Sequence, residues 1–138
     1  MYKRQLLHLR PIPVRVEPEE GECFDTTALL FSACNGTQFA GGMHLAPLSD
    51  PADGLLDICI LKGIGRIAFL QLLPRYIKGE HLGSKHIVYF KARRVTAAAE
   101  AGLTLNLDGE LGSATPVTFE ALPGALTILA PTPAGPVQ

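Results

Sequence analysis

The chain has 138 residues, of which 47% are hydrophobic and 18% charged, and this composition fits one domain of ordinary size with a substantial core. The formal net charge of −1 gives no general attraction for nucleic acid, so we expect no nucleic-acid partner. No apolar run reaches the length of a membrane span, and the three cysteines lie far apart. These features predict a cytoplasmic protein with reduced thiols, and they leave peripheral membrane contact and a homo-oligomer open.

The chain begins with a segment that we interpret as the end of a helix. Residues 2–9 carry apolar side chains at helical spacing, but Pro11 and Pro13 prevent the helix from continuing. We therefore expect residues 1–9 to be the remnant of a helix that starts further upstream. From residue 12 to residue 17, apolar and polar side chains alternate, which predicts a strand.

A β-hairpin is predicted next. Two apolar segments, residues 26–34 and 37–45, are joined by Asn35-Gly36, a pair that readily forms a tight hairpin turn. Gly41-Gly42 interrupts the second segment, which indicates a bulge or a close approach to the backbone. The nearly continuous apolar run at residues 55–61 then predicts a further strand.

One internal helix is predicted at residues 66–78, with Gly79 placed to end it. The apolar residues that share its predicted amphipathic face are Ile67, Leu70, Leu73 and Ile77. Strands are predicted at residues 86–95, 103–107, 116–122 and 126–129, and the proline-rich tail at residues 132–138 is expected to be frayed. Many strands and one helix predict a mainly β fold, an antiparallel β-sandwich or barrel with one internal helix.

The segment from Gly63 to Ala68 fits the dinucleotide-binding pattern Gly-x-Gly-x-x-Gly/Ala and precedes the predicted helix. A doubly wound sheet needs repeated strand-helix units, however, and one helix among many strands does not supply them. A glycine-containing loop before a helix is the better interpretation. The four histidines lack metal-ligand spacing and are expected to be structural or exposed.

Three aspartates, Asp50, Asp53 and Asp57, lie within one short segment. Carboxylates and backbone carbonyls suit a hard cation such as Mg²⁺ or Ca²⁺, but spacing alone favours a solvated turn. The sequence NLDGEL at residues 106–111 poses a similar question. Glu110 follows an Asp-Gly turn, and Gly112 predicts that the second strand is short. Glu110 is therefore either a solvated turn residue or a carboxylate that acts as a base towards a hydroxyl.

Taken in order, these motifs resemble the C-terminal half of the family of diacylglycerol kinases, sphingosine kinases and bacterial lipid kinases. The matching run consists of Asn35-Gly36, Gly41-Gly42-Met43, Ala46-Pro47, Asp53-Gly54-Leu55-Leu56-Asp57, Gly79-Glu80-His81, Asp108-Gly109-Glu110 and Leu122-Pro123-Gly124-Ala125-Leu126. Each piece is short, but their shared order covers nearly the whole chain from about Arg10 to Pro131.

The resemblance implies a two-domain lipid kinase in which an N-terminal domain holds ATP through a Gly-Gly-Asp-Gly-Thr loop. This sequence contains no such loop, so the resemblance covers the second domain, a β-sandwich at residues 10–131, and the ATP-binding domain is expected to be its partner. Carried over by position, Glu110 is the general base and Asp108 supports its orientation. The resemblance also places Mg²⁺ at Asp53, Asp50 and the backbone carbonyl of Leu55.

The leading hypothesis is therefore the acceptor-side domain of a kinase that phosphorylates a diacylglycerol-like or sphingoid hydroxyl with ATP. A second hypothesis is that the isolated chain is a non-catalytic module that contacts lipid or docks to a partner. A dinucleotide-binding enzyme is the remote third hypothesis.

Overall fold

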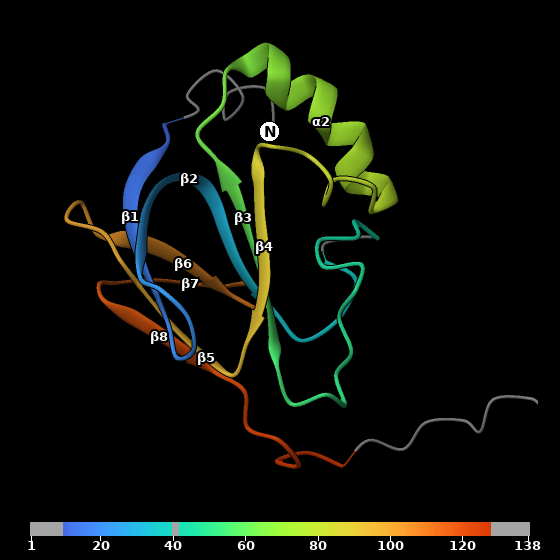
Figure 1. The fold of residues 1–138 in the computed structure, drawn as a ribbon, viewed down its shortest axis with the longest axis vertical. Coiled ribbons are helices and arrows are strands. Elements are labelled where there is room, and N and C mark those ends of the chain that lie inside the picture. The colour runs from blue at the N-terminus through green and yellow to red at the C-terminus, as the bar shows by residue number, and fades with distance from the viewer. Residues whose placement is uncertain (1–9, 40–41, 128–138) are drawn as a thin grey trace, which may run out of the picture.

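The computed structural model describes residues 10–39 and 42–127 of the chain (Figure 1). Within these ranges the elements are β1 (Ile12–Pro18), β2 (Phe24–Cys34), β3 (Leu56–Lys62), α2 (Arg66–Lys78), β4 (Ile87–Ala92), β5 (Arg94–Ala98), β6 (Leu103–Leu107), β7 (Glu110–Ala114) and β8 (Val117–Glu120). All pairings between these strands are antiparallel. The predicted mainly β fold with one internal helix is confirmed. The predicted helix remnant and frayed tail lie outside the described residues.

Six of the described strands form one sheet in the order β4-β3-β2-β1-β5-β8, and β6 and β7 form a separate hairpin. The rings of Phe31 in β2 and Phe119 in β8 stack with their centroids 5.9 Å apart. Because β1 and β5 lie between β2 and β8 in the sheet order, this contact requires the sheet to fold over on itself, as the strands of a β-sandwich do.

The strand β3 is buried on both faces, which explains its nearly continuous apolar sequence. Ile58 and Ile60 belong to the core that also contains Leu103 of β6. Cys59 and Leu61 point the other way, into a second core with residues of α2. Figure 1 accordingly shows the β6–β7 hairpin and α2 in different parts of the molecule, with β3 between them.

The helix lies where it was predicted, and Gly79 ends it in a left-handed conformation with φ 75°. The Glu80 N–H donates to the Arg75 carbonyl at 2.8 Å across this turn, which satisfies one of the last free carbonyls of the helix. The apolar residues that were predicted to share one face are not those that pack on the core. Leu72 and Tyr76 are the buried residues of α2, whereas the predicted face is mostly exposed.

The predicted hairpin around Asn35-Gly36 is also wrong. β2 pairs with β1 over residues 24–28 and with β3 over residues 28–34, and none of these pairings involves residues 37–39 or 42–45. Between residues 37 and 45, the described part of the chain contains only an isolated bridge between Phe39 and Met43. Gly41 of the predicted bulge lies outside the described residues.

Two further strand predictions need correction. Residues 86–95 do not form one strand, because a bend at Arg93 separates β4, which pairs with β3, from β5, which pairs with β1. Leu126 and Thr127 are not in a strand, and the rest of the strand predicted at residues 126–129 lies outside the described residues.

Candidate functional site

The turn that carries Asp108 and Glu110 is a two-residue hairpin loop between β6 and β7. Leu107 pairs with Glu110, which leaves Asp108 and Gly109 as the loop residues, with φ values of 50° and 105°. Positive φ at both positions is what a type I′ turn requires. The Gly109 N–H also donates to the Asn106 side-chain oxygen at 2.8 Å. Local sequence chemistry therefore explains why the chain turns at this point.

The second strand of this hairpin is complete, contrary to prediction. β7 pairs with β6 from Glu110 through Ala114, and Gly112 lies opposite Leu105 without ending the strand. Glu110 is the first residue of β7 and is exposed. Its carboxylate is thus held by a regular hairpin at the point where the strand leaves the turn.

A mostly apolar cavity of about 680 Å³ lies beside this hairpin. Its walls come from β2 and the loop that follows it, from one face of α2 and from β6, with single residues of β3 and β8, and they include Phe31, Leu105 and Phe119. Asp108 is part of the lining, two positions before Glu110. The cavity joins residues that are far apart in the sequence, and no local motif indicated it.

The acidic turn brings Asp50, Asp53 and Leu55, the residues that the resemblance assigned to Mg²⁺, close together. The Asp53 N–H donates to the Asp50 carbonyl at 3.2 Å, and the Leu55 N–H donates to Asp53 Oδ1 at 2.9 Å. Asp50 Oδ1 accepts the Ala52 N–H at 2.9 Å. These are the contacts of an acid-rich turn, and several of the oxygens assigned to the metal already accept a backbone hydrogen bond.

Lys91 of β4 joins the acidic turn to the sheet through an ion pair with Asp53. No sequence motif indicated this contact. Lys91 Nζ lies 2.6 Å from Asp53 Oδ2 and 3.8 Å from Asp57 Oδ1. The hydrogen bond to Lys91, together with the one from the Leu55 N–H, lowers the pKa of Asp53, and the same carboxylate raises the pKa of Lys91. Asp57 and Lys91 are cross-strand partners in β3 and β4, so only the strand register could have revealed this contact.

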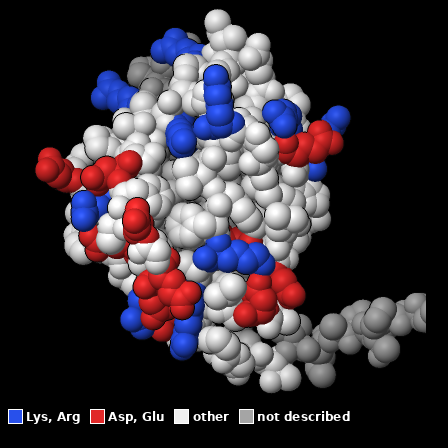
Figure 2. Space-filling view, viewed as in Figure 1, with Lys and Arg blue, Asp and Glu red and all other residues white. Residues whose placement is uncertain are grey.

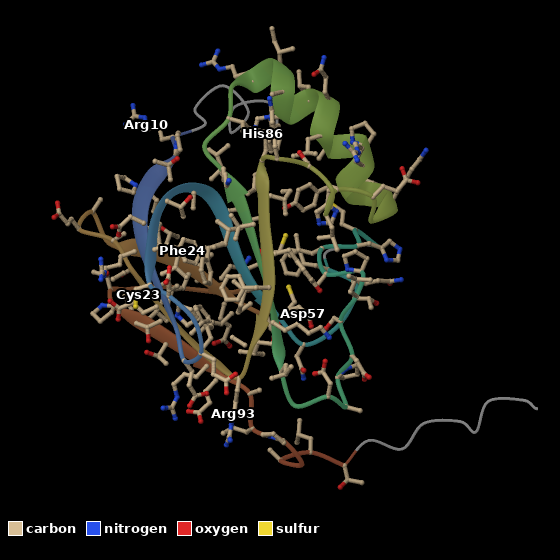
Figure 3. All side chains as sticks on the ribbon, viewed as in Figure 1. Arg10, Cys23, Phe24, Asp57, His86 and Arg93 are labelled. Atoms are coloured by element: carbon tan, nitrogen blue, oxygen red, sulfur yellow. The ribbon has the colours of Figure 1, made fainter. Side chains whose placement is uncertain are left out.

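Asp57 itself is completely buried, and Figure 3 shows it on the side of the sheet where the acidic loop runs. The Tyr89 hydroxyl donates to Asp57 Oδ1, while Oδ2 has no hydrogen-bond partner among the described residues. Burial and the hydrogen bond to Asp57 raise the pKa of Tyr89. Asp57 is therefore a structural carboxylate at the base of the acidic turn.

The acidic turn and the hairpin turn remain separate groups, because no hydrogen bond or ion pair joins their described residues. Nor do the described residues contain a cluster of three or more His, Cys, Asp or Glu side chains that could hold a metal ion. A cation in the acidic turn would depend on backbone carbonyls as well as carboxylates, and it would share Asp53 with the Lys91 ammonium.

His81 belongs to the core, in agreement with the structural role predicted for the histidines. Its ring stacks on Tyr76 at a centroid distance of 3.8 Å, and Nε2 lies 3.1 Å from the Leu45 carbonyl. Cys59 Sγ lies 3.4 Å from the Tyr76 hydroxyl. Burial raises the pKa of the Cys59 thiol, which argues against a nucleophilic role for this cluster.

The glycines of the dinucleotide-like segment have structural explanations. A Cβ atom on Gly63 would lie 2.8 Å from Pro11 Cβ and 2.9 Å from Thr27 Oγ1, so packing leaves no room for a side chain. Gly65 is the residue that precedes the first turn of α2. Together with the antiparallel sheet, these roles favour the loop interpretation over a dinucleotide site.

Comparison with known proteins gives consistent matches along the chain. A family model described as the YegS C-terminal NAD kinase beta sandwich-like domain matches residues 2–130. The diacylglycerol kinase of Bacillus subtilis (strain 168) is 36% identical over 111 residues, which make up 80% of this chain and 36% of that protein. The diacylglycerol kinase of Mycobacterium tuberculosis (strain CDC 1551 / Oshkosh) is 30% identical over 127 residues, or 92% of this chain and 41% of that protein.

A similar solved structure is the crystal structure of a candidate diacylglycerol kinase from Bacillus anthracis (strain Sterne). It has a TM-score of 0.71 and 25% sequence identity, and the match covers 89% of this chain and 40% of that one. The chain therefore spans about two fifths of the length of the proteins that it matches.

Proposed function

Because the chain belongs to the YegS-like lipid kinase family and corresponds to its C-terminal β-sandwich domain, we propose that it forms the lipid-acceptor side of an ATP-dependent kinase in the cytoplasm. The acceptor would be a diacylglycerol-like or sphingoid hydroxyl. The observation that carries this proposal is the apolar cavity beside the hairpin, because an acyl chain in it would bring the lipid head towards the turn at Asp108.

In this proposal, Glu110 is the general base. Its carboxylate accepts the proton of the lipid hydroxyl while the hydroxyl oxygen bonds to the γ-phosphorus of ATP, and ADP leaves with the electrons of the broken P–O bond. Asp108 lies at the cavity wall, and in this proposal it supports the orientation of Glu110 through the two-residue turn. Positioning of the reacting groups is the main requirement of phosphoryl transfer. Glu110 is the first residue of β7, so the strand fixes the position of its backbone.

The phosphate-binding side belongs, in this proposal, to an N-terminal ATP-binding domain. The chain contains no Gly-Gly-Asp-Gly-Thr segment. Backbone N–H groups in such glycine-rich loops are the usual partners of phosphate oxygens.

We further propose that Mg²⁺ binds the acidic turn through Asp53, Asp50 and the Leu55 carbonyl. An all-oxygen set in a tight turn suits this hard cation, which neutralises negative charge on phosphate groups when bound. The close ammonium of Lys91 opposes binding, because it already neutralises Asp53. Lys91 and the cation would therefore compete for one carboxylate.

This competition predicts that Lys91→Met strengthens Mg²⁺ binding, by roughly tenfold, because a like charge is removed from the turn. Isothermal titration of the 138-residue chain with MgCl₂ measures the affinity directly. Arg94→Met is a matched control, since it breaks an exposed ion pair with Glu120 in another part of the sheet. Equal Mg²⁺ affinity of the unchanged chain and of the Asp53→Asn variant would refute the proposal that the acidic turn binds Mg²⁺.

The role of Glu110 is tested in a chimaera in which this chain replaces the matching C-terminal segment of the B. subtilis diacylglycerol kinase. Glu110→Gln should lower the rate of lipid phosphorylation by roughly 10²- to 10⁴-fold, because the amide cannot accept the hydroxyl proton. ATP binding should be unchanged.

Glu100→Gln supplies the control, because this exposed glutamate lies outside the hairpin turn. The assay follows radiolabelled phosphate from ATP into lipid, with circular dichroism as the check of folding. Full turnover by the Glu110→Gln chimaera would rule out Glu110 as the base.

The alternative for the isolated chain is a non-catalytic module that contacts lipid or docks to a partner. The absence of a phosphate-binding loop in the sequence motivates it. We expect the purified 138-residue chain to show no turnover with ATP, Mg²⁺ and diacylglycerol. Appreciable turnover would refute this alternative and the requirement for a separate ATP-binding domain.

A further inference from the structure

The helix α2 has two apolar faces, and only one of them is covered by the core. Phe69, Leu72 and Tyr76 pack towards the second core and line the cavity. Ile67, Leu70 and Ile77 point away from it and are 75%, 55% and 51% exposed. These three positions recur at intervals of three and seven residues, which places them along one side of the helix. We call this set the outer face of α2.

Basic residues lie on α2 and in the chain segments next to it. Arg75 and Lys78 lie in the last turn of α2, and the helix contains no acidic residue. The segment from residue 62 to residue 86 has five basic side chains, Lys62, Arg66, Arg75, Lys78 and Lys85, against one acidic side chain, Glu80. In Figure 2, blue predominates in the upper part of the view, where Figure 1 places α2, whereas most red lies lower down.

We propose that the outer face of α2 binds the surface of an anionic lipid bilayer. The apolar residues would enter the region between headgroups and acyl chains, and the basic side chains would reach the lipid phosphates. The helix has 13 residues, so it would lie in the plane of the membrane. No helix among the described residues is long and apolar enough to cross a membrane. The proposal does not depend on the kinase assignment.

The charge around the outer face favours a membrane over a second copy of the chain. In a symmetric dimer through α2, the same basic residues of both copies would come together and repel each other. An anionic bilayer has the opposite charge, and each Lys or Arg near its surface adds to the attraction. An apolar strip with basic flanks is the composition of helices that lie at such interfaces.

The experiment is co-sedimentation of the 138-residue chain with vesicles of phosphatidylcholine, with and without phosphatidylglycerol. We expect binding only to vesicles that contain phosphatidylglycerol, and a decrease of that binding with added NaCl. The double variant Ile67→Ser/Leu70→Ser should bind roughly tenfold more weakly. Leu48→Ser is the matched control, because Leu48 is 63% exposed in the loop between β2 and β3, and it should bind like the unchanged chain.

The charge variant Arg75→Gln/Lys78→Gln should lose about fivefold in affinity for each charge, and Arg15→Gln in β1 should lose nothing. All substituted side chains are exposed, so we expect every variant to keep the fold. Circular dichroism of each variant checks this. Equal binding to both kinds of vesicle would overturn the proposal, as would unchanged binding by the Ile67→Ser/Leu70→Ser variant. Analytical ultracentrifugation tests for a dimer. The proposal would also be overturned if the unchanged chain formed a dimer that the Ile67→Ser/Leu70→Ser variant does not form, and if neither bound vesicles.

Discussion

His81 is a fully buried ionisable residue whose surroundings favour its neutral form. Burial lowers the pKa of the imidazole, although the hydrogen bond to the Leu45 carbonyl opposes this effect. The ring stacks on Tyr76 of α2, so His81 joins the helix to the segment that follows it, and protonation there would place a charge in a site closed to solvent.

The lowered pKa predicts a loss of stability at acidic pH. The unfolded chain binds a proton at His81 near pH 6.5, the ordinary value, whereas the folded chain does so only at lower pH. The stabilising contribution is therefore complete above pH 6.5 and decreases as the pH falls below that value. Urea unfolding at pH 7.5 and 5.5 should show a smaller pH dependence in His81→Phe than in the unchanged chain.

His86→Gln is the control for this experiment, because His86 follows five residues later in the chain but is only partly buried. It should keep the pH dependence of the unchanged chain. The same pH dependence in His81→Phe as in the unchanged chain would exclude His81 as its source.

At the scale of elements, the β6–β7 hairpin depends on one glycine more than on the other. Gly109 has φ 105°, a conformation that side chains with a Cβ rarely adopt, whereas Gly112 lies within β7, where an added Cβ would meet no atom within 4 Å. We predict that Gly109→Ala lowers the free energy of unfolding by about 1 kcal/mol or more, because the turn becomes strained.

Gly112→Ala should leave the free energy of unfolding unchanged or raise it by about 0.5 kcal/mol, because the unfolded chain loses conformational freedom. Urea denaturation of the two variants gives the comparison. Equal destabilisation by both would show that the turn conformation is not the reason for the glycine at position 109.

The helix α2 and the strand β3 were predictable from the sequence, but the residues that pack against them were not. Residues 66–78 have apolar side chains at two sets of helical positions, and the sequence does not say which set meets the sheet. Leu72 and Tyr76 are the buried set because they pack against Cys59 and Leu61 of β3 in the second core. The hydrophobic pattern alone therefore identified the helix but not the face that packs on the core.

The candidate site likewise has parts that local sequence patterns predict and parts that they do not. Asp108-Gly109 and the acidic turn form through contacts between neighbours in the sequence, so local patterns located both. Lys91 reaches the turn residue Asp53 from β4, and its position follows from the register of β3 with β4. The cavity is lined by residues of β2, α2, β6 and other elements, which a sequence read without an alignment does not place together.

For the molecule as a whole, β1 has a central position. In the sheet it lies between β2 and β5, so the strands β4, β3 and β2 are joined to β5 and β8 through it. The two halves of the sandwich thus share one strand, and their contact is completed by Phe31 and Phe119. The resemblance to a family with a β-sandwich domain predicted this class of fold but not the strand order.

This arrangement has a consequence for synthesis on the ribosome. Val16 in β1 pairs with Phe24 almost as soon as both are made, but its other neighbour, Ala97, follows about eighty residues later. Until β5 is available, one side of β1 displays unpaired backbone groups, which another nascent chain can use to form an intermolecular sheet. Slow translation or crowded polysomes would therefore favour aggregation of the unfinished chain more than of the completed protein.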